Sequence, residues 1–285
     1  MGRSGPTQRG GGDLEKRTRV CDIFGHDYPI IQGGMLGISS PELVAAVSNA
    51  GGLGLLSGEA KALRQQIRRT RELTPRPFGV NIPLTIAKTG GLEPVINLVV
   101  EEGVEVIATA AGNPVPWVQR LKDAGLKVMH VVPTARLAQR AEDAGADAVV
   151  ASGFEAGGFL GHDQVTTMAL VPLVVDSVSI PVIAAGGIAD ARGMVAAFAL
   201  GAEGVQLGTR FVATRECSAP KRQVAAGALG QARLLKMDIL GGEASPGARM
   251  RYSAGQIAGV VREIKSAREV VEEMVRDYDR IISSL

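Results

Sequence analysis

The sequence predicts an α/β fold of the TIM (β/α)8 barrel class with a C-terminal helical extension. Eight short apolar runs rich in β-branched residues recur along the chain, and helical segments separate most of them. The runs do not alternate with polar residues, which is typical of parallel strands buried on both faces. Eight strand–helix units of about 25–30 residues each indicate a barrel. The runs are Pro29–Gly33, Gly52–Ser57, Pro77–Pro83, Val104–Ala110, Lys127–Val132, Asp147–Ser152, Pro181–Gly186 and Gly204–Phe211.

Seven segments have helical periodicity. The first is PELVAAVSNA, which follows Ser40 as an N-cap, has Pro41 at its first position and ends at Gly51. A doubly wound sheet would show the same alternation of strands and helices. The count of eight and the lack of GxGxxG after the first run favour the barrel. The other segments are Ala60–Leu73, Pro114–Ala124, Thr134–Ala144, Thr166–Val178, Asp190–Leu200 and Ala219–Leu229.

The chain has 285 residues, enough for one large domain or two small ones at roughly 100–200 residues per domain. No linker or shift in composition divides it. We expect residues 1–20 to form a disordered arm, because their start, MGRSGPTQRGGG, is polar and rich in glycine. Residues 21–285 then form a single barrel domain. Within it, 241–252 is a polar insertion and Ala254–Leu285 a terminal helix.

Charge and cysteine content exclude several classes of protein. Thirty-one basic and 29 acidic residues leave a net charge of +2, which offers no general argument for a nucleic-acid or membrane partner. No apolar run reaches the roughly 18 residues of a transmembrane helix. Cys21 and Cys217 lie too far apart in sequence for a CxxC site. A reducing compartment, the cytoplasm, is therefore expected.

Glycine is the candidate marker of a ligand site. The chain has 37 glycines, and pairs of them follow predicted strands at Gly33-Gly34, Gly157-Gly158 and Gly186-Gly187. Any one pair is also consistent with a tight turn. Together they permit close approach of backbone N–H groups to a bound ligand. The pair at 186–187 precedes a helix, and Gly208-Thr209 follows the next strand. The loops after strands seven and eight bind phosphate in many barrels.

Several stretches resemble one enzyme family. They are IIQGGM, FGVN, GFEAGG, TTMALVP, PVIAAGGIADARGMVAAFALGAEGVQLGTRF and YSAGQIAG. They are similar to the nitronate monooxygenase (2-nitropropane dioxygenase) group, which also holds the FMN-dependent enoyl-ACP reductase and NADH:quinone reductases. The similarity runs from about Pro29 to Gly259. It implies an FMN-binding barrel and is less specific for the reaction.

The resemblance implies roles for individual residues around FMN. Asn81 would offer its amide to the polar edge of the ring, or else is a turn residue before Pro83. Ser152 stands where the family usually has Gln, Glu or Asp at the ribityl chain, and a hydroxyl can still donate or accept there. Gln206 would point to the phosphate loops, or else is a buried strand amide. The expected phosphate ligands are Gly186, Gly187, Gly208 and Thr209, and the expected neighbours of the ring are Gly34, Met35, Gly157 and Gly158.

The family's usual catalytic His after EAGG is replaced here by Phe159. Histidine suits proton transfer because its unperturbed pKa lies near neutrality, and phenylalanine cannot replace it in that role. His162, three residues further along a glycine-containing loop, is one candidate catalytic residue, with a solvent-exposed loop residue as the alternative. His130, in the fifth predicted strand, is the other, with a hydrogen-bonded core histidine as the alternative.

The expected function is FMN-dependent oxidation of alkyl nitronates with O2. Loss of the usual His argues against enoyl reduction, which needs a proton donor, more than against nitronate oxidation or quinone reduction. An NAD(P)H-dependent enoyl-ACP or quinone reductase is the alternative. A flavin-free phosphate-binding lyase or isomerase is the alternative from another class, though Glu155 is the only acid at a strand end and Lys127 begins a strand. A non-catalytic flavin-binding protein also stays open.

The expected partners are a small-molecule substrate and, as electron donor, NAD(P)H. The sequence has no GxGxxG fingerprint for a dinucleotide, and no metal site is expected, since HExxH is absent. Trp117 and the terminal helix are candidate contact surfaces for a homodimer.

Overall fold

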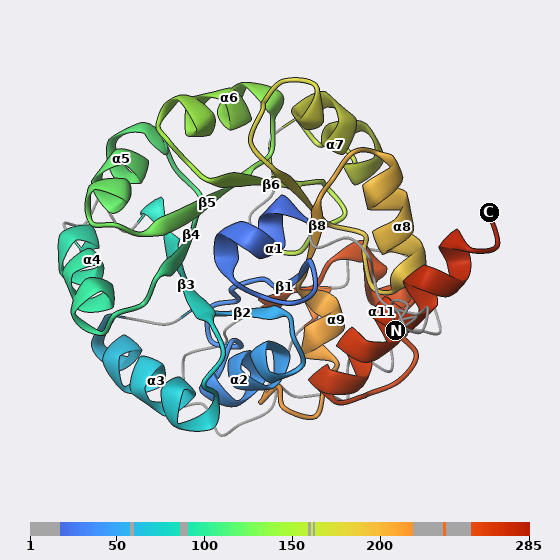
Figure 1. Ribbon diagram of the computed structural model, residues 1–285, viewed down its shortest axis with the longest axis horizontal. Helices are drawn as coiled ribbons and strands as arrows, with labels where there is room; N and C mark the ends of the chain where they lie inside the picture. The colour runs from blue at the N-terminus through green and yellow to red at the C-terminus, as the bar shows by residue number, and fades with distance from the viewer. Residues whose placement is uncertain are drawn as a thin grey trace, which may run out of the picture.

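A closed barrel of eight parallel strands forms the centre of the protein, and a ring of helices surrounds it (Figure 1). The computed structural model describes residues 18–57, 60–85, 91–158, 161, 163–218, 236–237 and 252–285. Each strand pairs with its sequence neighbour, and β1 closes the barrel on β8. The TIM-barrel prediction is therefore confirmed. The strands are β1 (Ile30–Gln32), β2 (Leu53–Leu56), β3 (Phe78–Pro83), β4 (Val106–Ala110), β5 (Lys127–Val132), β6 (Ala148–Ser152), β7 (Val182–Ala185) and β8 (Gly204–Leu207).

The eighth predicted strand was too long. The apolar run Gly204–Phe211 continues past the strand because Thr209–Val212 forms the short helix α9, whose residues are all buried. The backbone turns at Gly208, and the amide of Phe211 donates to the Gly208 carbonyl at 2.9 Å. Gly208 and Thr209 thus lie in a strand-to-helix turn, the kind of position expected for a ligand loop.

The helices of the ring follow the predicted segments closely. Ser40 caps α2 through its side chain, which accepts from the amide of Leu43, and Pro41 occupies the first position. The helix α4 was not among the predicted segments. The predicted helix Ala219–Leu229 lies outside the described residues. The ring helices are α2 (Pro41–Asn49), α3 (Ala60–Leu73), α4 (Leu92–Glu101), α5 (Val115–Asp123), α6 (Ala135–Asp143), α7 (Thr167–Val175) and α8 (Ala191–Ala199).

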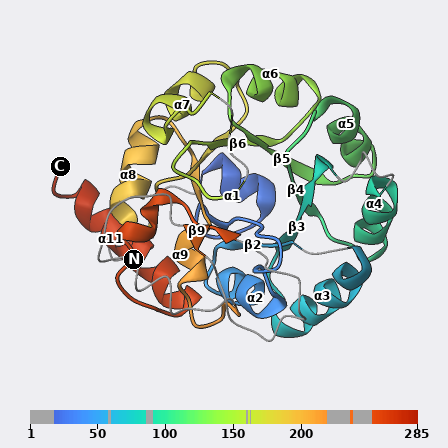
Figure 2. The same ribbon diagram turned by 180° about the vertical axis from the view of Figure 1, so that it is seen from behind.

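A short N-terminal helix, α1 (Arg19–Phe24), lies across the barrel axis in both views (Figures 1 and 2). Val20 and Phe24 are buried among the inward-facing strand residues, and Val20 lies beside Gly204 at the start of β8. The helix therefore closes the barrel at the amino-terminal ends of the strands. The predicted disordered arm, residues 1–20, was too long at its C-terminal end, because Arg19 and Val20 belong to this helix. Residues 1–17 lie outside the described residues.

The predicted terminal helix is two elements. The 3-10 helix η3 (Gln256–Gly259) precedes α11 (Ala267–Ile282), which begins at a capping box between Ser266 and Glu269. The apolar face of α11 packs on α8 and α2, and Phe198 and Tyr278 meet edge to face at 5.6 Å between ring centroids. Figure 2 shows α11 beside α8 and α9 on one side of the ring. Two short strands, β9 (Lys236–Met237) and β10 (Tyr252–Ser253), pair antiparallel.

Strand residues alternate between two apolar layers. One layer faces the barrel interior, and the other packs against the helices. The alternation assigns every strand residue to a face, which decides whether a side chain can reach the barrel mouth. Interior residues are Ile31, Leu53, Leu55, Val106, Ala108, Met129, Ala148, Val150, Ile183 and Ala185. No helix that the structure describes is long and apolar enough to cross a membrane.

Candidate active site

Three polar side chains point inward near the carboxyl ends of the strands. Ser152 lies two positions after the interior residue Val150 on β6, and therefore faces the same way. Asn81 and Gln206 each lie between two residues of the helix-facing layer, so they also face inward. The structure thus brings Asn81, Ser152 and Gln206 to one rim, above a floor of apolar side chains. These are three of the residues predicted to contact a cofactor.

The loop after β1 lies between the ends of β3 and β8. A Cβ on Gly33 would lie 3.2 Å from the amide group of Gln206, and a Cβ on Gly34 would lie 2.2 Å from Cβ of Asn81. A Cβ on Gly208 would lie 3.6 Å from Sδ of Met35. The side chain of Asn81 therefore leaves no room for a Cβ at position 34, whereas a Cβ at position 33 would make a tight contact with Gln206. The sequence predicted that Gly34 lies beside a bound ring, but it did not indicate that Gly34 packs against the side chain of Asn81.

The turn after β7 has the geometry expected of an anion site. Gly186 and Gly187 have left-handed backbones, with φ of 97° and 71°. The turn leads into α8, where the Asp190 carboxylate caps the helix by accepting from the amide of Arg192 at 3.0 Å. Gly158, in the loop after β6, is also left-handed at φ 78°. Among the residues that the structure describes, none lies within 4 Å of a Cβ built there.

Glu155 connects the loop after β6 to its neighbours. Its carboxylate accepts from the backbone amide of Thr167 at 2.8 Å and thereby caps α7. The Thr167 hydroxyl lies 3.0 Å from that carboxylate and 3.0 Å from the Gly186 carbonyl oxygen. A Cβ on Gly187 would lie 3.5 Å from Cβ of Glu155. The sequence identified Glu155 as an acid at a strand end, but nothing local to it indicated a partner twelve residues away.

A segment near the C-terminus completes the rim. The amide of Gly255 donates to the Thr209 hydroxyl at 2.9 Å, and the amide of Gln256 donates to the Glu155 carbonyl at 2.9 Å. The sequence motif YSAGQIAG carried part of the family resemblance, but it was assigned no role. The structure places it against the loops that follow β6 and β8.

The geometry of His130 does not support the predicted catalytic role. Val128 and Val132 on the same strand face the helices and Met129 faces the interior, so His130 points toward the helices. It is 1 % exposed, and its Nδ1 lies 2.7 Å from the Thr109 hydroxyl on the neighbouring strand. Burial lowers the pKa of His130 to about 4. These features fit the alternative, a hydrogen-bonded core histidine.

The other candidate base, His162, lies outside the described residues, as does Phe159. The acids at the described part of the rim are engaged in structure: Glu155 caps α7, and Asp190 pairs with Arg192 at 2.6 Å. Among the residues that the structure describes, no group of three or more His, Cys, Asp or Glu side chains gathers as a metal site would require.

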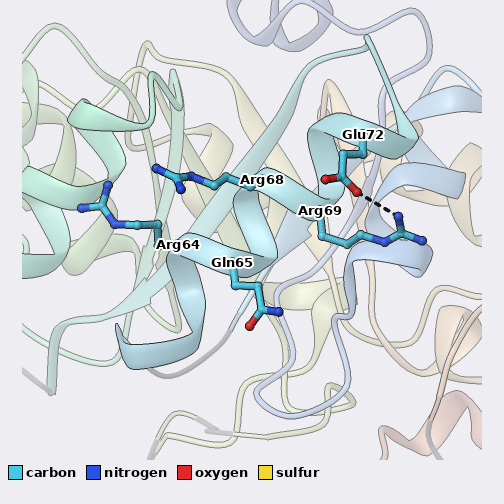
Figure 3. Close-up of a pocket in the computed structure, with 5 residues that line it drawn as sticks. All are labelled: Arg64, Gln65, Arg68, Arg69 and Glu72. Carbon is cyan, nitrogen blue, oxygen red and sulfur yellow. Dashed lines mark hydrogen bonds and ion pairs between the residues drawn. The ribbon is translucent and has the colours of Figure 1, made fainter.

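A cavity elsewhere on the protein does not belong to this rim. Figure 3 shows it on the outer surface of α3, lined by charged and amide side chains. The arginines there are paired with carboxylates: Arg69 with Glu72 at 2.9 Å, and Arg64 and Arg68 with Glu102, which follows the last residue of α4. Arg68 and Arg64 lower the pKa of Glu102, with the Arg68 hydrogen bond as the largest cause. The lining residues are Arg64, Gln65, Arg68, Arg69 and Glu72.

The rim at the carboxyl ends of the strands fits a flavin. An apolar floor suits the face of a flat ring, and the inward amides and hydroxyl suit its polar edge and side chain. At one end lie the left-handed glycines 186 and 187 and the turn at Gly208, and glycine turns before helices are the kind of backbone that binds phosphate through its N–H groups. The loop after β6 lies beside this end, because a Cβ on Gly186 would lie 3.0 Å from the Ala156 amide nitrogen.

Comparison with known proteins identifies the family. The family model described as nitronate monooxygenase matches residues 17–94 and 92–239. A protein from Staphylococcus saprophyticus, described as a probable nitronate monooxygenase, is 39% identical over 251 residues, covering 72% of this chain and 71% of its own. The (3aS,4S,5R,7aS)-5-hydroxy-7a-methyl-1-oxo-octahydro-1H-indene-4-carboxyl-CoA dehydrogenase of Rhodococcus jostii is 41% identical over 207 residues. That match covers 72% of this chain, which spans only 57% of the dehydrogenase.

Solved structures give the same answer for the fold and the family. The structure of FabK from Thermotoga maritima superposes with a TM-score of 0.83 at 36% identity, covering 94% of this chain and 98% of its own. The nitroalkane oxidase from Streptomyces ansochromogenes superposes with a TM-score of 0.78 at 28% identity, covering 94% and 100%. With a family model matching more than half of its length and relatives at this level of identity, the chain belongs to the nitronate monooxygenase family of flavin-dependent oxidoreductases.

Proposed function

We propose that the protein is an FMN-dependent oxidoreductase that oxidises alkyl nitronates with O2. The observation that carries this proposal is the rim itself, where the left-handed turn after β7 and the turn at Gly208 adjoin three inward polar side chains. These turns offer backbone donors for one phosphate, as in a mononucleotide, and the chain has no GxGxxG fingerprint for a dinucleotide. When bound, the flavin supplies the electron transfer between substrate and O2, and the protein supplies binding, orientation and proton handling.

The residues at the rim take the roles that the sequence implied. Gly186, Gly187, Gly208 and Thr209 bind the phosphate, and Asn81 offers its amide to the polar edge of the ring. Ser152 faces the ribityl chain between ring and phosphate, and Gln206 points toward the phosphate loops. The residues that line the ring are Gly34, Met35, Gly157 and Gly158.

The choice of reaction depends on proton handling. A nitronate is already deprotonated, so its oxidation asks less of a protein base than an enoyl reduction does. The described rim contains Glu155 and Asp190 in structural roles and holds His130 away from the mouth. This combination favours nitronate oxidation, with His162 as the proposed proton-handling residue. Substitution of His162 with alanine is expected to lower kcat without changing FMN affinity, as measured by steady-state oxygen consumption and flavin titration.

A reductase that takes electrons from NAD(P)H is the second candidate, favoured by the similarity to FabK. The flavin-free lyase or isomerase has lost its support, because the family is flavin-dependent.

The proposed partners are the nitronate and, for the second candidate, NAD(P)H, which would bind in the open mouth of the barrel. We propose a cytoplasmic location, because a chain of this length with only two cysteines is typical of proteins from reducing compartments. For a homodimer, Trp117 remains the proposed contact, because α11 is already packed on α8 and α2.

Anaerobic reduction of the bound flavin tests this proposal directly. The purified protein is expected to be yellow and to release FMN on denaturation. A panel of an alkyl nitronate, NADH, NADPH and an enoyl thioester then separates the candidates, and bleaching by the nitronate alone supports the first. Colourless protein that does not take up added FMN contradicts the flavin proposal. Bleaching by NADH or NADPH with no response to the nitronate selects the reductase.

The phosphate turn has its own test, in which Gly187 is replaced by alanine. The added Cβ meets nothing closer than 3.5 Å, so the substitution acts through the left-handed backbone, at a cost of about 1–2 kcal/mol. If the turn binds phosphate, FMN affinity measured by fluorescence quenching is expected to fall at least tenfold. Gly125→Ala is a matched control, with φ of 79°, open space around it and a place at the end of α5. It should lose similar stability with no change in affinity. If the two variants bind FMN with equal affinity, the turn after β7 is not the phosphate site.

A further inference from the structure

The segment of residues 254–257, here called the strap, crosses the loops at the phosphate end of the proposed FMN site. Its last two residues begin η3, and it is far in sequence from both loops that it touches. One hydrogen bond runs from the amide of Gly255 to the Thr209 hydroxyl, and another from the amide of Gln256 to the Glu155 carbonyl, each at 2.9 Å. The strap therefore joins the loop after β6 to the turn after β8 through its own backbone.

The fit between strap and loop leaves no room for a side chain at Gly255. A Cβ there would lie 2.6 Å from the Glu155 carbonyl oxygen and 3.2 Å from both the Ala156 carbonyl carbon and the Gly157 amide nitrogen. These are backbone atoms, which cannot rotate aside as the end of a flexible side chain can. The constraint at Gly255 is purely steric, because its φ of −71° is open to any residue. A larger residue at this position must lift the strap from the loop.

The contact with Thr209 has a chemical consequence. A hydroxyl has one proton to donate and two lone pairs to accept with. The amide of Gly255 occupies a lone pair, which leaves the hydroxyl proton to donate to another acceptor. Thr209 is 7 % exposed and follows Gly208 at the turn proposed for phosphate, whose oxygens are strong acceptors. The hydrogen bond from the Gly255 amide thus leaves the Thr209 hydroxyl with its proton to donate to a phosphate bound at this turn.

We propose that the strap is a positioning element for the cofactor phosphate, in which Gly255 orients Thr209 and Gln256 holds the loop after β6. This inference rests on the proposed FMN function. The phosphate and the strap then stabilise one another, because each favours the same arrangement of Thr209 and the loop. By linkage, weakening the strap weakens phosphate binding, and binding of phosphate protects the strap.

The test compares FMN with riboflavin, which has the same ring and ribityl chain but no phosphate. Substitution of Gly255 with alanine is expected to weaken FMN binding at least tenfold and to leave riboflavin binding within twofold, as measured by flavin fluorescence titration. Gly259→Ala is the matched control nearby, since a Cβ there meets nothing within 4 Å. It should bind both flavins like the starting protein. Equal weakening of FMN and riboflavin by Gly255→Ala, or no weakening, overturns the proposal.

A second set of variants tests the route through Thr209. Thr209→Val should reproduce the selective loss of FMN affinity, and Thr209→Ser, which keeps the hydroxyl, should restore most of it. In the Gly255→Ala background, Thr209→Val should add less than threefold, because Gly255→Ala has already lost the orientation of the hydroxyl that Thr209→Val removes. Independent, multiplicative losses would contradict the coupling.

Hydrogen exchange gives a readout that does not depend on the substitutions. FMN is expected to slow amide exchange in residues 254–257 by at least tenfold, and riboflavin to slow it far less. Equal protection by the two flavins contradicts the role of the phosphate. If the starting protein binds neither flavin, the proposed function itself fails, which is distinct from failure of the strap.

Discussion

Replacing Gly34 with alanine is expected to weaken FMN binding between tenfold and a hundredfold in a protein that still folds. The new Cβ would lie 2.2 Å from Cβ and 2.8 Å from Cγ of Asn81, distances at which one of the two residues must move. Overpacking of this kind costs about 1–3 kcal/mol. The strain falls on Asn81, which is proposed to bind the ring, and on the loop after β1. Flavin titration measures the affinity, and thermal unfolding measures the stability.

Two further variants separate the steric effect from the loss of the amide. Asn81→Gly alone removes the amide without a clash and measures what that group contributes to affinity. Combined with Gly34→Ala, it also removes the atom that the new Cβ would meet, so the double variant should regain most of the stability lost in Gly34→Ala. Unchanged FMN affinity in Gly34→Ala would show that the loop after β1 does not position the ring.

The strand pattern was predictable because each strand is a short apolar run bounded by turn residues, a signal contained in a few neighbouring residues. The eighth run was overextended for a related reason. Thr209, Phe211 and Val212 are as buried in α9 as they would be in a strand, so hydrophobicity does not mark the point where the strand ends. Only Gly208, where the backbone turns, marks the boundary.

The two missed helices differ in what could have revealed them. In α4 the buried residues are Leu92, Val95, Ile96 and Val99, which is the spacing of one helical face, so periodicity alone could have identified it. The helix α1 has only six residues, RVCDIF, too few for a periodic pattern. It forms because Val20 and Phe24 fill the end of the barrel, a tertiary effect that the local sequence does not contain.

The positions of the site were more predictable than its contacts. Glycines at strand ends indicated where the chain turns at the mouth, and Gly186 and Gly187 are left-handed there. The partners of these glycines were not readable, because they are distant in sequence. Gly34 accommodates Asn81, 47 positions away, and Thr209 meets Gly255, 46 positions away. Which atoms fill the space of a missing Cβ depends on the closed barrel.

The role of His130 depends on which face of β5 it lies on, and the hydrophobicity of the strand does not show which face that is. In KVMHVV both sides of the strand are apolar, because the interior and the helix layer are both buried. Only the closed barrel shows which residues of the strand face the interior and which face the helices. The contact with Thr109 then explains why a histidine is tolerated in the helix layer, since its ring nitrogen has a hydrogen-bond partner on the next strand.

Acidification is expected to destabilise the protein through His130. Its pKa is about 4 in the folded state, because burial disfavours the charged ring, and 6.5 is its ordinary value in an unfolded chain. Above pH 6.5 the residue is neutral in both states and has no effect. As the pH falls from 6.5 to 4 the unfolded state binds a proton that the folded state does not, so the free energy of unfolding falls. The loss reaches about 3 kcal/mol at pH 4.

A variant that cannot titrate isolates this effect. His130→Leu combined with Thr109→Val removes the ionisable ring and its hydrogen-bond partner together, so no buried polar group is left alone. Urea unfolding at pH 7 and at pH 4.5 should show a smaller acid loss in this variant than in the starting protein, by at least 2 kcal/mol. Since His130 faces the helices, FMN affinity and turnover at pH 7 should be unchanged. A folded, flavin-loaded variant with lost turnover would instead place His130 in the reaction. An acid loss equal to that of the starting protein would show that His130 has the same pKa in the folded and unfolded states.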